Sequence, residues 1–232
     1  MNSHEITSFQ KTLLGAAFVA GPALLCASTT SFALGIGLIP PGVSSWVEGI
    51  FGSLGIACFV PIYLELSRRV GRSHPRLGAL TSVTGLFGAT VGVALEFLRV
   101  AEHAFRSNGA ADGVFAATYS NPGWEFLSVA LLGPLFPLTS ILLGVGAFAG
   151  RTMPRGVAAC LVAAGVGFPL AQVAGLELAL RFTYPAAGVL WLIALAPLGV
   201  AYFREAASER RNAPGATPVQ RRNARWNVLA SE

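Results

Sequence analysis

Charged residues leave long gaps in this 232-residue chain, and these gaps restrict what it can fold into. Such gaps include residues 12–47, 49–64, 77–95, 126–150 and 182–203. An apolar helix of about 20 residues is what the roughly 30 Å hydrocarbon core of a bilayer requires. The chain is 53% hydrophobic and 12% charged, with a mean hydropathy of +0.62. The sequence therefore predicts a polytopic membrane protein without a soluble domain.

Six apolar spans are expected, so the predicted fold is an all-α membrane helix bundle. The spans cover residues 12–39, 47–66, 77–100, 126–149, 156–180 and 184–203, within a transmembrane domain of residues 1–203, and a basic tail of residues 204–232 follows. Ser31-Phe32-Ala33 could serve as a signal-peptidase site, but the hydrophobic run continues to Ile39. We therefore interpret the first span as an uncleaved helix.

The distribution of basic residues predicts the orientation. With the N-terminus in the cytoplasm, 13 of the 16 basic residues lie inside and only Arg99, Arg106 and Arg181 lie outside. The positive-inside rule thus places both termini in the cytoplasm, for a multi-pass protein expected in the cell (inner) membrane. The net charge of +5 is then a topology signal, and nucleic-acid binding is not expected.

The third span predicts how the bundle is organised. At 100° per residue, Gly85, Gly88 and Gly92 fall on the same side of the helix as Glu96, and Phe87 falls on the opposite side. Small residues let membrane helices approach closely, so this glycine face is expected to pack against another helix. A second small-residue face, Gly49, Gly52 and Gly55, is expected on the second span.

Prolines fall in every expected span except the third. They include Pro22, Pro61, Pro134, Pro137, Pro169 and Pro197. Pro134 and Pro137 should kink the fourth span, because a proline removes a backbone hydrogen bond within a helix. Broken helices at mid-membrane are frequent in transporters, but no convincing repeat relates the two halves of the chain.

Two stretches carry a resemblance to a known family. They are Pro61-Ile62-Tyr63-Leu64-Glu65-Leu66-Ser67-Arg68-Arg69 and the segment from Leu132 to Val157, where a Gly/Pro-containing helix meets a short basic turn and Pro-Arg opens the next helix. Over roughly two thirds of its length, the chain resembles a family of uncharacterised bacterial six-helix integral-membrane proteins. The resemblance implies an architecture and no established activity, so it assigns no site residues.

Ionisable residues outside the inner loops are expected to gather at one membrane level. Glu96 lies about 28 Å along its helix from Leu77, near the outer boundary of the hydrocarbon. Glu48 and Glu125 begin the second and fourth spans on the same side. The candidate ligand- or proton-binding cluster consists of Glu96, Arg99, His103, Glu125, Glu177 and Arg181. It is either such a site or a ring of interfacial ion pairs that fixes helix depth; catalysis is the third alternative.

The sequence predicts an accessory or ligand-binding membrane protein, with a small-molecule, ion or proton transporter as the alternative. A membrane-embedded enzyme is less favoured, because no nucleophile arrangement or metal-ligand spacing occurs, and no cofactor or metal is expected. Glu65 should pair with Arg68 and Arg69, three and four residues on. Expected partners are the lipid bilayer, with anionic lipids near the C-terminal tail, and either a membrane protein or a second copy of the chain.

Overall fold

The computed structural model describes residues 3–36, 45–108, 120–173 and 179–212, and every element in these ranges is a helix. The elements are α1 (Ser3–Leu34), α2 (Trp46–Gly71), α3 (Pro75–Ser107), α5 (Trp124–Ala130), α6 (Leu135–Gly150), α7 (Arg155–Val173), the short π-helix η1 (Ala179–Thr183) and α8 (Tyr184–Asn212). The predicted all-α class is confirmed for the described part of the chain.

Within the described residues, five helical segments are long and apolar enough to cross a membrane. They are Thr7–Leu34, Trp46–Gly71, Pro75–Ser107, Trp124–Gly150 and Leu180–Arg211. The apolar helix of α7, Arg155–Ala171, is shorter. The architecture is therefore that of a helical, multi-pass membrane protein.

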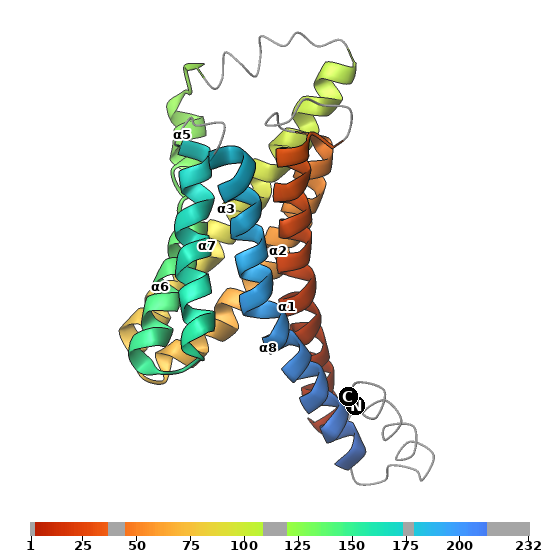
Figure 1. The fold of residues 1–232 in the computed structure, drawn as a ribbon, viewed down its shortest axis with the longest axis vertical. Coiled ribbons are helices and arrows are strands. Elements are labelled where there is room, and N and C mark those ends of the chain that lie inside the picture. Colours follow the sequence, from red (N-terminus) through yellow and green to blue (C-terminus); the bar gives the residue numbers. More distant parts are fainter. Residues whose placement is uncertain (1–2, 37–44, 109–119, 174–178, 213–232) are drawn as a thin grey trace.

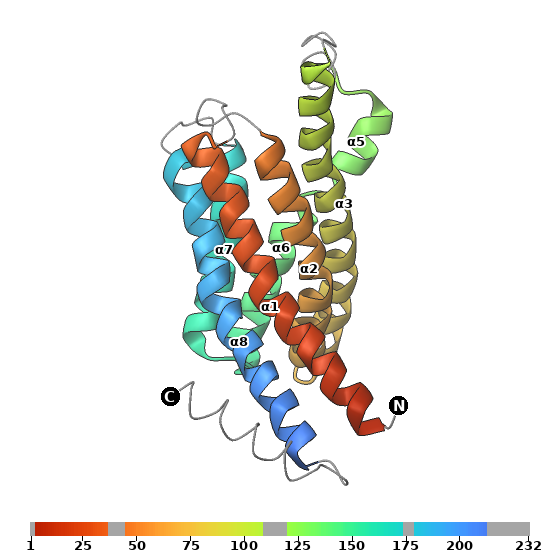
Figure 2. The same ribbon diagram turned by 90° about the vertical axis from the view of Figure 1, so that its right-hand side faces the viewer.

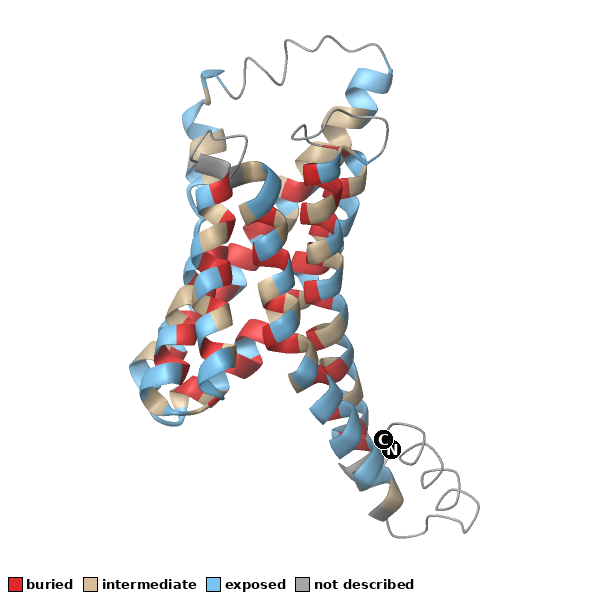
Figure 3. Cartoon of the chain, viewed as in Figure 1, coloured by how far each residue is buried: buried red, intermediate tan, exposed pale blue. Residues whose placement is uncertain are grey.

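The helices lie side by side as an elongated bundle (Figures 1 and 2). The most extensive pairings are α1 with α8, α2 with α3, and α1 with α2, followed by α6 with α7, and α3 also packs on α6. The start of α1, the end of α8 and the α2–α3 and α6–α7 turns share one end, which we call the basic end (Figure 1). The opposite end, which we call the far end, holds α5, the end of α3 and the start of α8. Buried positions follow the faces where helices meet (Figure 3).

The glycine face of α3 packs closely against α2 and α6 in the centre of the bundle. Gly85 lies against the Tyr63 side chain of α2, and Gly88 lies against the backbone of Phe136 at the start of α6. Phe87, on the opposite side of the helix, is 51% exposed. The predicted packing face is confirmed, because a side chain at these glycines would hold the neighbouring helices apart.

Packed aromatic rings fill the middle of the bundle. Phe136 of α6 lies with its ring centroid 5.2 Å from Phe59 and 5.5 Å from Trp191. Phe168 of α7 lies 5.3 Å from Trp191 and 5.1 Å from Tyr184. These separations are those of favourable aromatic pairs, so the rings join α2, α6, α7 and α8 into one apolar core.

Polar atoms inside this aromatic core are hydrogen-bonded to one another. The Tyr63 hydroxyl donates to the Phe136 carbonyl oxygen at 2.9 Å, and the indole N–H of Trp191 donates to Ser140 Oγ at 2.7 Å. A buried polar group without a partner has a high free-energy cost in an apolar interior. These bonds therefore fix the positions of α2 and α8 against α6.

The proline-containing fourth span is divided. The helix α5 ends at Ala130, residues 131–134 form a turn, and α6 begins at Leu135. The expected kink is therefore a break between two helices. Pro134 and Pro137 explain it, since neither has a backbone N–H to continue the helical hydrogen bonding.

Ion pairs tie the helices together at the basic end. Glu65 pairs with Arg68 at 2.8 Å and Arg69 at 2.9 Å, as predicted, and it also accepts a hydrogen bond from the Tyr202 hydroxyl of α8. On α1, Lys11 pairs with Glu205 at 3.0 Å and Glu209 at 2.6 Å. These bonds explain why α8 continues to Asn212 beyond the expected span end at residue 203.

Candidate functional site

Glu96 lies buried at the far end of the interface between α2 and α3. Its side chain is only 5% exposed. The backbone of α2 leaves room for it, because Gly52 has no side chain and a Cβ there would lie 2.5 Å from Glu96 Oε2. Gly49 likewise faces the Glu96 carbonyl oxygen. The small-residue face predicted on the second span thus accommodates a carboxyl group as well as a helix.

Glu48, in the first turn of α2, brings a second carboxyl group to the same place. The Ser45 hydroxyl accepts a hydrogen bond from the Glu48 N–H at 3.1 Å, and the Ser45 N–H donates to Glu48 Oε2 at 3.4 Å. This reciprocal pair is a capping box, which fixes both the helix start and the glutamate side chain. Ser28 of α1 also donates to the Glu48 carbonyl oxygen at 3.0 Å. The Glu48 side chain is fully buried.

Arg99 of α3 joins the two carboxyl groups. Its Nη1 pairs with Glu48 Oε1 and, at 3.1 Å, with Glu96 Oε2. Arg99 also hydrogen-bonds the hydroxyl of Tyr184, the buried first residue of α8. Its side chain is 20% exposed, so the site reaches the surface through the arginine. We call Glu48, Glu96, Arg99 and Tyr184 the far-end cluster.

The charges in the far-end cluster do not balance. Two ionised carboxylates and one guanidinium leave one negative charge among side chains that are mostly buried. An uncompensated buried charge is very unfavourable, and groups in this position gain a proton or a counter-charge. The cluster can therefore accept one positive charge, supplied by a proton or by the cationic group of a ligand.

The other predicted site residues lie apart from this cluster or beyond the described residues. His103 stands one turn past Arg99, with its ring 6.2 Å from that of Trp46 and a nitrogen 3.4 Å from Ser107 Oγ. Glu125, in the first turn of α5, and Arg181, in η1, are both exposed. Glu177 lies outside the described residues. Of the six predicted residues, Glu96 and Arg99 form an ion pair with each other in the described part of the chain.

Sequence reasoning left Glu48 and Tyr184 out of the site. For Glu48 a signal was available, since Ser45-x-x-Glu48 is a capping-box pattern and Gly49 and Gly52 follow at once. For Tyr184 the sequence indicated only that the residue lies at the start of the last span. Its place beside Arg99 depends on how α8 packs against α1 and α7, which a single sequence does not specify.

Comparisons of this chain with protein-family models, with curated proteins and with solved structures found no match. In the ranges that the structure describes, no group of three or more His, Cys, Asp or Glu side chains is placed to hold a metal ion. We therefore infer the chemistry of the far-end cluster from the geometry of its own residues.

Proposed function

We propose that the chain is a ligand-binding or accessory membrane protein whose far-end cluster exchanges a proton for a cationic ligand group. One observation carries the proposal: two buried carboxyl groups share a single arginine. Without ligand, one carboxyl group of the pair is protonated. When a cationic group binds between the carboxylates and that proton leaves, the total charge of the site is unchanged. Catalysis has less support, because the cluster contains no evident nucleophile.

We further propose six membrane crossings with both termini in the cytoplasm. The 19 residues of α7 correspond to about 28 Å of helix, close to the thickness of the hydrocarbon core. The basic end carries arginines from α2, α3, α6–α7 and α8, which supports placing it inside. The far-end cluster would then open to the outside. Membership of the bacterial six-helix family that the sequence resembles stays a hypothesis.

Labelling of introduced cysteines tests this orientation. In a variant whose three native cysteines are replaced, single cysteines at Ser107 and Ser120 should react with a membrane-impermeant thiol reagent on intact cells. A cysteine at Ser73, in the α2–α3 turn, should react only after the cells are opened. All three positions are exposed, so access to the side chain is matched. The reverse pattern would place the far-end cluster on the cytoplasmic side.

Neutral substitutions test the charge count of the far-end cluster. Glu48→Gln or Glu96→Gln should each leave one carboxylate facing Arg99, so either variant should stay within about 1 kcal/mol of the wild-type stability. Glutamine also preserves the capping box at position 48. The double variant leaves the Arg99 charge unpaired and should lose on the order of 3 kcal/mol. Thermal unfolding in detergent measures the stability of all three variants. If the loss in the double variant equals the sum of the losses in the two single variants, simple ion pairing is indicated instead.

Transport is the second candidate. Polar groups occur at three levels, in the far-end cluster, around Ser140 and around Glu65, and this spacing favours a proton or ion route through the bundle. The aromatic rings of Phe136, Phe168 and Trp191 are in contact between these levels, so a route would need a conformation in which they separate. We rank binding above transport for that reason.

A further inference from the structure

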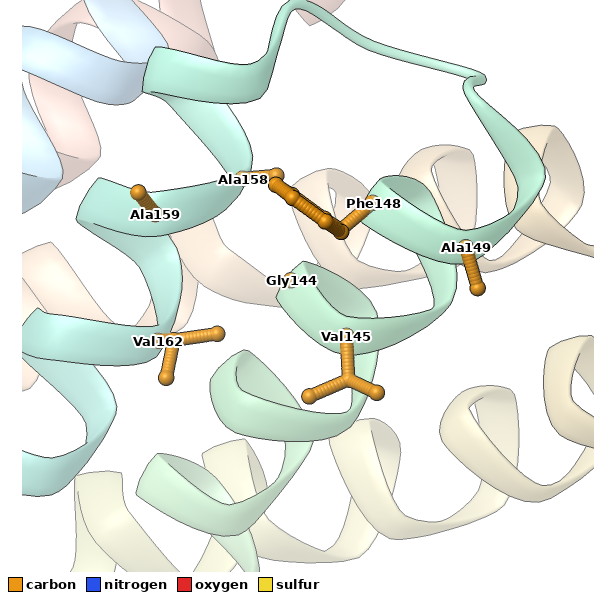
Figure 4. Close-up of a pocket in the computed structure, with 7 residues that line it drawn as sticks. All are labelled: Gly144, Val145, Phe148, Ala149, Ala158, Ala159 and Val162. Carbon is orange, nitrogen blue, oxygen red and sulfur yellow. The ribbon is translucent and has the colours of Figure 1, made fainter.

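Two hollows flank the C-terminal part of α6 near the basic end. The larger, of about 540 Å³, is bounded by the α2–α3 turn and includes Ser73, His74 and Arg76 in its wall. The smaller, of about 220 Å³, lies between α6 and α7 and is walled by apolar side chains (Figure 4). Figure 4 shows Phe148 reaching from α6 toward Ala158 of α7 across this smaller hollow. Val145 and Ala149 belong to both hollows, so the two adjoin along one ridge of α6.

The polar wall of the larger hollow has positive charge that the rest of the described chain does not neutralise. Arg76 forms no ion pair with another described residue, and neither do Arg72 and Arg151 in the neighbouring turns. His74 Nε2 is buried and has no hydrogen-bond partner among the described residues. A buried polar nitrogen in that state is unfavourable, and the Arg76 guanidinium beside it in the wall supplies hydrogen-bond donors for an anion.

We propose that these two hollows hold one anionic phospholipid, with its phosphate at Arg76 and His74 and its acyl chains along Val145 and Ala149. The hollows have a basic, polar part and an apolar part, just as such a lipid has an anionic head group and apolar acyl chains. A basic, polar rim lies at the end of the bundle where the arginines gather, and an apolar trough leads from it along α6 toward the membrane interior. Anionic lipids of the inner leaflet attract basic residues at this level. This inference uses the orientation proposed above, but it does not use the far-end cluster.

The smaller hollow gives the acyl chain a defined place. Gly144 faces the α7 backbone, which keeps α6 and α7 close at the floor of the hollow. Phe148 is 55% exposed and Val145 is 53% exposed, so an acyl chain can cover both. The Arg155 guanidinium lies 5.8 Å from the centre of the Phe148 ring and adds a second cation near the phosphate level.

Retention of defined lipids by the full-length protein tests the site. Purified protein is incubated with phosphatidylglycerol or phosphatidylcholine in detergent, and bound lipid is counted by native mass spectrometry. Arg76→Gln should lower phosphatidylglycerol retention roughly fivefold, because one basic residue near the phosphate is lost. Arg204→Gln, an exposed arginine of α8 at the basic end but outside the hollows, should change it little. Phosphatidylcholine should bind weakly to every variant.

A second pair of variants tests the acyl trough separately. Ala159 is exposed and lines the smaller hollow, so Ala159→Phe should fill it and reduce phosphatidylglycerol retention. Ala163→Phe, also exposed and one turn further along α7, should not. Equal retention in Arg76→Gln and Arg204→Gln, or in Ala159→Phe and Ala163→Phe, would overturn the proposal, as would equal binding of the two lipids. Because the far-end cluster is unchanged in all four variants, failure here leaves the proposed function standing.

Discussion

Gly88→Ala is expected to destabilise the bundle strongly, whereas Gly156→Ala should leave its stability unchanged or slightly raised. A Cβ at Gly88 would lie 2.6 Å from the carbonyl carbon of Leu135 and 2.7 Å from Phe136 Cα. Backbone atoms cannot rotate away as a side chain can, so α3 and α6 must move apart. Overpacking of this kind costs about 1–3 kcal/mol. Because the added Cβ meets backbone, we expect the cost of Gly88→Ala to lie at the upper end of that range.

Gly156 supplies the matched control, because its added Cβ would meet no described atom within 4 Å apart from its chain neighbours and the backbone of its own helix. Alanine favours helix over glycine by roughly 1 kcal/mol, so the same chemical change should be neutral or stabilising there. Thermal unfolding of both variants in one detergent gives the comparison, with the exposed Phe87→Leu as a further control. Equal midpoints for the two alanine variants would show that close α3–α6 packing does not stabilise the protein.

Arg99→Gln is expected to be the most damaging single change in the far-end cluster. Among the described residues, it removes the only cation that pairs with Glu48 and Glu96, and it leaves these two buried carboxyl groups without an arginine. Breaking a buried pair by removing one partner costs about 3–5 kcal/mol, and the 20% exposure of Arg99 places the expected loss near the lower end.

Two further variants separate this charge effect from a general loss of packing. Arg106→Gln removes a more exposed arginine of α3 from its pair with Glu102, where a change of about 0.5 kcal/mol is expected. Adding Glu48→Gln to Arg99→Gln should recover part of the lost stability, since one of the two buried carboxyl groups left without the arginine is removed. If the double variant is less stable than Arg99→Gln alone, the loss does not come from buried carboxyl groups without a counter-charge, and the charge argument is wrong.

The sequence predicts those features that follow from regular spacing. The gaps between charges predict the helical membrane character, and the 100° rotation per residue predicts that Gly85, Gly88 and Gly92 share a contact face. The pairing of Glu65 with Arg68 and Arg69 follows from their separation within one helix. Each of these depends on residues close together in the chain, where helix geometry alone fixes the distance.

The composition of the far-end cluster depends on contacts between distant segments. Glu48 meets Arg99 because α2 and α3 are held close by glycines, and Tyr184 arrives from the start of α8. Membrane depth alone suggested Glu125 and Arg181 as partners, but both are exposed on short elements at the far end. Residues at the same depth can point in different directions around a bundle, and the sequence does not give those directions.

Infrared spectroscopy of the carboxyl groups tests the central claim most directly, because protonated and ionised carboxyl groups absorb at different frequencies. In ligand-free protein at neutral pH, the account predicts one protonated carboxyl group that is missing from the spectra of both Glu48→Gln and Glu96→Gln. Addition of a cationic ligand should convert that group to the carboxylate in the wild type. A spectrum in which both carboxyl groups are already ionised, with no bound cation, would contradict the proposal that the far-end cluster takes up one positive charge.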